Sequence, residues 1–243
     1  MNASRLLVAL ALTSALIVGC SGGSATASLT PTPGGSSTAS LPATQNCVVI
    51  EDYADLKGCN LAGASLAGAD LAYANLIGAN LTNADLTGAD LTGADLTGAT
   101  LRDAAISYAN LTSANLTGAD FTSAGLTGAD FTSANLTDVT FNGANLNAAN
   151  LADANLTTAS LSGVDFYEAL LTNVNFSGAN LTGAYLFGAD LSGANLTNAN
   201  LTGANVVYAN LTGADLTGAY VRDVDLELAN LSGATMPSGL VHP

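Results

Sequence analysis

Aromatic side chains are scarce in this sequence. The 243 residues include no tryptophan, six phenylalanines and seven tyrosines, so aromatic residues make up only 5% of the chain. A conventional core for a chain of this length contains more large side chains. The composition therefore predicts a core built from small residues.

Basic residues are scarcer still. Four Lys and Arg stand against 19 Asp and Glu, which gives a formal net charge of −15. Binding to nucleic-acid phosphates needs Lys or Arg to displace counterions. We therefore expect no direct nucleic-acid partner, although an acidic mimic of DNA stays open.

Residue types that carry catalysis are nearly absent. The single histidine is the penultimate residue, His242, and the three cysteines show no zinc-ligand spacing with it. Glycines recur at a five-residue period, which fits neither a phosphate-binding loop nor the nine-residue period of calcium-binding β-helix repeats. We expect no catalytic, metal or cofactor site, and no enzyme.

The N-terminus reads as an export signal over residues 1–19. One charge at Arg5 precedes the mostly apolar stretch Leu6–Val18, which is too short to span a bilayer. Leu16–Cys20 then resembles a bacterial lipobox. That resemblance implies cleavage before Cys20, acyl chains on its thiol and amine, and a membrane-anchored lipoprotein on the extracytoplasmic side of the cell envelope. An ordinary secretory signal with a chance cysteine is the alternative.

Residues 20–46 form a different compositional region. After Cys20 the chain is rich in Ser, Thr, Gly, Ala and Pro, and Ser21–Gln45 carries no charge. Such a segment buries too little apolar surface to become ordered. It is predicted to be a flexible tether.

The rest of the chain is one repeat. Every fifth residue from Leu56 to Leu231 is Leu, Ile, Val or Phe, which makes 36 consecutive positions, and a small residue, usually Ala, stands two residues before nearly every one of them. A period of five fits neither an α-helix nor a long strand. Residues two apart point the same way in extended backbone, and glycines such as Gly88, Gly93 and Gly98 suit a turn with positive φ. Each unit is therefore predicted to be a short extended piece followed by a corner.

The unit Ala-(Asp/Asn)-Leu-Thr-Gly resembles the pentapeptide-repeat family, over roughly Ala54 to Met236. The resemblance implies an all-β fold, a right-handed quadrilateral β-helix with four units per coil, about nine coils and a length of about 43 Å at the spacing of neighbouring strands. We assign this domain to residues 47–236, with Val48–Ile50 as an N-terminal cap and residues 237–243 as a loose tail.

Two cysteines flank the first coil. With Cys20 assigned to lipid, Cys47 and Cys59 are predicted to form a disulfide that joins the cap to the solenoid. The alternative is that Cys59 only fills an Ala position. The C-terminal coil edge has no capping helix, so a homodimer through that edge is a candidate contact.

Surface residues were aligned at a 20-residue spacing, as four units per coil requires. Hydroxyl residues then form ladders, one of them comprising Thr97, Thr117, Thr137, Thr157, Ser177, Thr197 and Thr217. Threonine suits outward strand positions, so the ladder is either structural or a candidate surface for ice or polysaccharide. Aspartates are spread over several columns, and so are the tyrosines, which predicts no aromatic stacking platform.

Three functions follow. The favoured one is a non-enzymatic, lipid-anchored envelope protein whose rigid rod is a scaffold or binds an unknown protein. The second, implied by the family resemblance, is an acidic DNA mimic that binds DNA gyrase. The third is the hydroxyl-ladder surface.

Overall fold

The computed structural model describes residues 52–243. The predicted signal peptide, Cys20, the tether, Cys47 and the cap Val48–Ile50 lie outside the described residues, so the structure leaves these predictions as they were.

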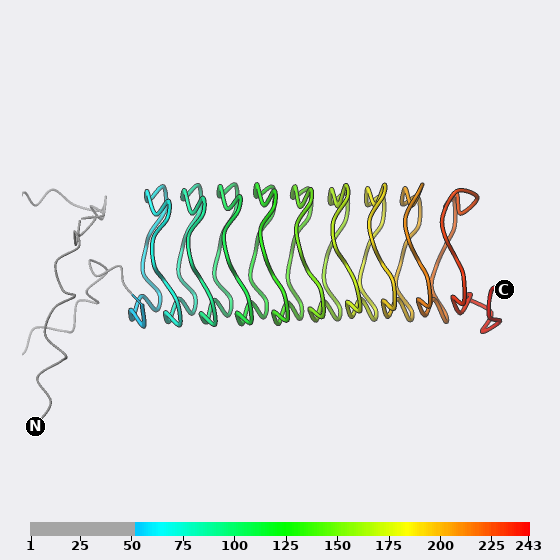
Figure 1. Cartoon of the computed structure of the whole chain (residues 1–243). Helices are drawn as coiled ribbons and strands as arrows, with labels where there is room; N and C mark the ends of the chain where they lie inside the picture. The colour runs from blue at the N-terminus through cyan, green and yellow to red at the C-terminus, as the bar shows by residue number, and fades with distance from the viewer. Residues whose placement is uncertain (1–51) are drawn as a thin grey trace, which may run out of the picture.

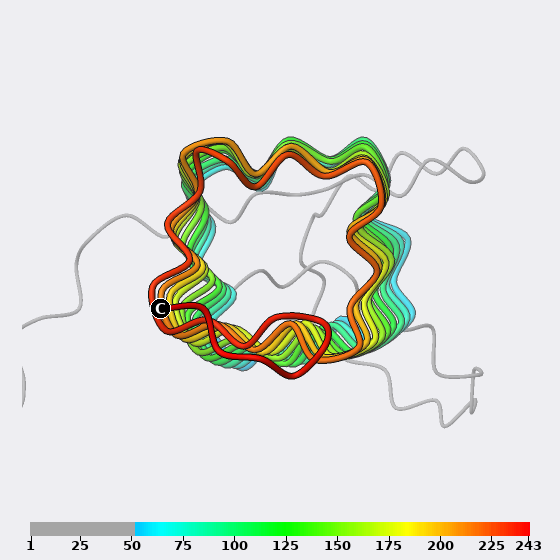
Figure 2. The same cartoon turned by 90° about the vertical axis from the view of Figure 1, so that its right-hand side faces the viewer.

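The described chain winds into a straight stack of coils with a four-sided outline (Figures 1 and 2). Residues 52–243 contain no α-helix and no continuous strand, and none of their segments is a helix that could cross a membrane. Instead, isolated parallel bridges join residues 20 apart, and nine of them follow one another from Asp55↔Asn75 to Asp215↔Thr235. The protein is a right-handed quadrilateral β-helix, as the sequence predicts.

The interior is formed by the two apolar columns of each unit. Leucines such as Leu136 are fully buried, and alanines such as Ala134 are 1% exposed. Phenylalanine replaces leucine at five buried positions, where Phe121 and Phe141 stack with their ring centroids 4.8 Å apart. Among the described residues no polar or charged residue is buried. The prediction of a core made of small and aliphatic residues is confirmed.

Each corner is a four-residue turn. In the first of them, the amide of Cys59 donates a hydrogen bond of 3.0 Å to the carbonyl of Leu56, and Gly58 between them has φ +64°. Positive φ at the third residue alone is the signature of a type II turn. Seventeen residues other than glycine also have positive φ, nearly all of them at this same turn position, among them Ala148 and Glu168.

The C-terminal tail differs from the prediction. Residues 237–243 are not loose, because Val241 pairs antiparallel with Thr235 and the amide of His242 donates a 2.7 Å hydrogen bond to the carbonyl of Ala234. The turn of Pro237–Gly239 lets the chain reverse, and the amide of Met236 donates to the carbonyl of Leu240. The sequence argument considered only a capping helix and overlooked this reversal.

The last coil separates from its neighbour along one side. Residues 184–188 are bonded to 204–208 through Leu186 N to Asn205 O and Gly188 N to Val207 O, but the equivalent bonds between 204–208 and 224–228 are missing from the described chain. Figure 1 shows this final red coil standing away from the orange one. Leu228 occupies the turn position usually held by glycine, and it does not adopt positive φ. A bulky residue disfavours that conformation, so the coil leaves the register there.

Candidate binding surfaces

The described residues offer little for chemistry. Within 52–243 no three His, Cys, Asp or Glu side chains are grouped closely enough to hold a metal ion. His242, the single histidine, is exposed, and its Nδ1 lies 3.2 Å from the carbonyl oxygen of Pro243. The surface of the rod, rather than a pocket, is therefore where function has to be sought.

Cys59 occupies a buried position of the inner alanine column, with 1% of its surface exposed. It is disulfide-bonded, and its partner lies outside the described residues. The pairing with Cys47 therefore remains a prediction.

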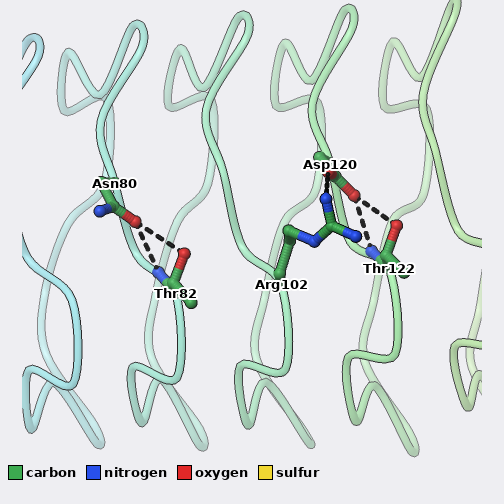
Figure 3. Close-up of polar contacts among 5 residues, drawn as sticks. All are labelled: Asn80, Thr82, Arg102, Asp120 and Thr122. Atoms are coloured by element: carbon green, nitrogen blue, oxygen red, sulfur yellow. Dashed lines mark hydrogen bonds and ion pairs between the residues drawn. The ribbon is translucent and has the colours of Figure 1, made fainter.

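A recurrent side-chain motif covers the outer surface. The Asp or Asn before the inward leucine accepts hydrogen bonds from the residue two positions later, as Figure 3 shows for Asn80 with Thr82 and for Asp120 with Thr122. In the second pair, Asp120 Oδ1 lies 2.9 Å from the Thr122 amide and 2.6 Å from its hydroxyl. Arg102 adds an ion pair to Asp120 at 3.3 Å (Figure 3). The Asx and Thr positions of the repeat are thus a local turn-stabilising pair.

The predicted hydroxyl ladder exists, and its hydroxyls have partners. The Thr117 hydroxyl donates to Asn115 Oδ1 at 2.8 Å and accepts from Asn135 Nδ2 at 2.9 Å. The same alternation of Asx and Thr is repeated at other members of the ladder: Thr97, Thr137 and Thr157. Thr197 instead pairs with Ser177 at 3.0 Å, and Thr217 donates to Asp215 at 2.6 Å. Because these hydroxyl protons point to neighbouring side chains, the contacts favour the structural role of the ladder.

The motif also changes the acidity of its carboxylates. Asp215 accepts hydrogen bonds from the hydroxyl and the amide of Thr217, and these bonds hold the pKa of the Asp215 carboxyl below its usual value of 3.8. Hydrogen bonds to the ionised form stabilise it. Below pH 7 the carboxylate therefore stays charged to lower pH than an isolated aspartate.

The structure contains an aromatic cluster that the sequence argument missed. Tyr167, Tyr185 and Phe187 lie with ring centroids 5.8 to 6.3 Å apart and with ring planes parallel to within 10°. Tyr208 meets Phe187 edge-on at 5.3 Å. We call Tyr167, Tyr185, Phe187 and Tyr208 the aromatic patch. The prediction that no stacking platform forms is wrong.

The reason is geometric. The sequence argument compared residues only at multiples of 20 and considered only tyrosines. However, the residues directly before and after an inward leucine both point outward on one side of the coil, as Tyr185 and Phe187 do around Leu186. Tyr167 is stacked 20 residues before Phe187. Including phenylalanine, and both outward positions of each unit, would have found the patch.

Other tyrosines lie apart from this patch. Tyr53 and Tyr73 stack on each other with their centroids 5.1 Å apart. The ring of Tyr108 covers Gly128, where an added Cβ would come within 2.8 Å of the ring. Tyr108 is 70% exposed and has no ring partner among the described residues.

Comparison with known proteins identifies the repeat. A family model described as pentapeptide repeats matches in eight copies between residues 52 and 237. HetL, a pentapeptide repeat protein involved in heterocyst differentiation regulation in the cyanobacterium Nostoc sp. strain PCC 7120, is 37% identical over 78% of this chain and 92% of its own, with a TM-score of 0.45. No curated protein sequence matches.

A second solved structure supports the fold. QnrB1, a plasmid-mediated fluoroquinolone resistance protein, is 23% identical over 72% of this chain and 90% of its own, with a TM-score of 0.57. At that identity the likeness concerns the coil architecture alone.

Proposed function

The chain belongs to the pentapeptide-repeat family, and from this premise we propose that it is a non-enzymatic, lipid-anchored protein of the bacterial cell envelope. Its rod is the working part, a rigid scaffold that presents side chains to a protein partner. The N-terminal segment serves as its address and its tether.

The anchor rests on the sequence Leu16–Cys20. An apolar residue three positions before a cysteine, with a small residue directly before it, follows the apolar stretch Leu6–Val18. An uncharged segment of about 25 residues then separates Cys20 from the first coil, a length that corresponds to a span of roughly 25 to 30 Å for a flexible chain.

The scaffold role rests on one observation, the unbroken core. The inward leucine column continues from Leu56 to Leu216 with its members at most 2% exposed, and no insertion interrupts the coil ladder between them. A solenoid of this kind offers a long surface and few internal degrees of freedom. Binding on such a surface needs no catalytic group.

The address is tested in the native host by membrane fractionation and mass spectrometry of the N-terminal peptide. We expect an acylated N-terminal Cys20 in the envelope fraction. A Cys20→Ser chain should lose the acyl chains and leave the membrane fraction, whereas Cys59→Ser should not change the location. Detection of an unprocessed Met1 in the cytoplasm would contradict the proposal and favour the DNA-mimic function.

We also propose a self-contact at the C-terminal end of the rod. Leu228, Leu240 and Val241 are 52%, 72% and 66% exposed in the last coil and the tail. Exposed apolar residues beside an unbonded coil edge are suited to contact with a second copy. The tail covers only part of that end, on the side where it pairs with Thr235 (Figure 2).

A further inference from the structure

The aromatic patch differs from every other part of the surface. Its positions carry polar residues in most of the other coils, namely Asn145, Asp165 and Asn205 in the column of Tyr185, and Thr127 and Asn147 in the column of Tyr167 and Phe187. The fold therefore does not need aromatic side chains there. Tyr208 is 61% exposed, Tyr185 39% and Tyr167 37%, so the rings are held against one another while a large part of them faces solvent.

Carboxylates border these rings. Asp165 is bridged to Tyr185 in the ladder, and its Oδ1 accepts the amide of Tyr167 at 3.0 Å. Glu168 follows Tyr167 directly and is exposed. A hydrogen bond to the Glu168 carboxylate, together with its negative charge, raises the pKa of the Tyr167 hydroxyl. The patch thus combines π-faces with fixed negative charge.

The protein has no free cation to satisfy this charge. The basic side chains of the described part are Lys57, Arg102 and Arg222. Arg102 pairs with Asp120, Arg222 pairs with Asp223, and Lys57 is in the first coil. A cation at the patch has to come from another molecule.

We propose that the aromatic patch, with Asp165 and Glu168, binds an extended, arginine-bearing segment of a protein partner. This deepens the scaffold function proposed above and rests on it. A guanidinium stacks on a tyrosine face and pairs with a carboxylate through its planar fork. In an extended segment, side chains two residues apart are about 6.6 Å apart, which matches ring spacings of 5.8 to 6.3 Å. A second copy of this chain is a poor occupant because it brings the same charge of −15.

The test uses the full chain and a fluorescent peptide with arginine at alternate positions, measured by fluorescence anisotropy. The double variant Tyr185→Asn, Phe187→Thr carries the residues that other coils have at these positions, so the fold is kept. We expect it to weaken binding about tenfold or more, as loss of two cation–π faces implies. Glu168→Gln should weaken binding and reduce its dependence on salt.

Tyr108→Ser is the matched control, since Tyr108 is exposed but far from any ring partner in the described chain. It should bind the peptide as the parent does. A peptide with lysine in place of arginine should bind more weakly, because an ammonium lacks the planar fork.

Three results would overturn the inference. One is equal binding of the peptide by the parent and the double variant, which would reduce the effect to overall negative charge. Another is no binding of the peptide by the parent. The third is aromatic-dependent retention on a neutral polysaccharide without peptide binding. None of these results bears on the acylation of Cys20, so a failure here is distinguishable from a failure of the envelope assignment.

Discussion

The corner residue shows how a local requirement is met in different ways. Gly88 has φ +66° with no atom within 4 Å of the site of an added Cβ, so only backbone strain opposes a side chain there. Ala148 has φ +54° at the equivalent position of a later coil. Alanine in this region costs about 1 to 2 kcal/mol relative to a right-handed conformation, whereas glycine adopts it readily.

A reciprocal pair of substitutions tests this strain. Ala148→Gly should raise the free energy of unfolding and Gly88→Ala should lower it, each by about 1 kcal/mol. Urea unfolding followed by circular dichroism measures both. If the two variants match the parent, the positive φ of these corners is not maintained in solution.

At the scale of a single side of the coil, register depends on that same corner. The side formed by residues 204–208 has three ladder bonds to the coil before it and none to 224–228 in the described chain. Leu228 stands where a glycine or a small polar residue closes most other corners. One residue at one corner therefore decides whether a whole side pairs.

Hydrogen exchange measures this pairing. The amides of Val206 and Tyr208 should exchange faster than those of Leu186 and Gly188, their counterparts 20 residues earlier, which donate at 2.7 and 3.0 Å. Leu228→Gly should slow the exchange of Val206 and Tyr208, because the corner can then close. Equal protection in the parent at both pairs of sites would show that the last coil is bonded in solution.

For the whole molecule, charge and shape act against each other at the ends of the rod. The final coil carries Arg222 against Asp223, Asp225 and Glu227, a net charge of −2 per copy from one positive and three negative groups. Charged residues at an open edge discourage edge-to-edge pairing. The exposed Leu228 and Leu240 favour it.

Association of the rods should therefore increase with ionic strength, because salt screens the carboxylates and leaves the apolar contact. Sedimentation equilibrium of the Cys20→Ser chain, which carries no acyl group, at low and high salt measures this. Leu240→Asp should reduce association, whereas Leu170→Asp, at an exposed leucine in mid-rod, should not. A monomer under every condition would contradict the self-contact.

The sequence alone determined the coil. The Leu and Ala columns, the positive-φ corner and the twenty-residue spacing follow from a five-residue period, because each unit repeats the same local conformation and stacks on its own copy. Only the tertiary structure decided what lies side by side on the surface. The contacts of Tyr167 with Tyr185 and Phe187 join two coils across an 18- and a 20-residue separation, and they depend on ring orientation rather than on the repeat. The paired tail and the open side at Leu228 likewise arise where the repeat ends, since there the chain no longer has a next coil to dictate its path.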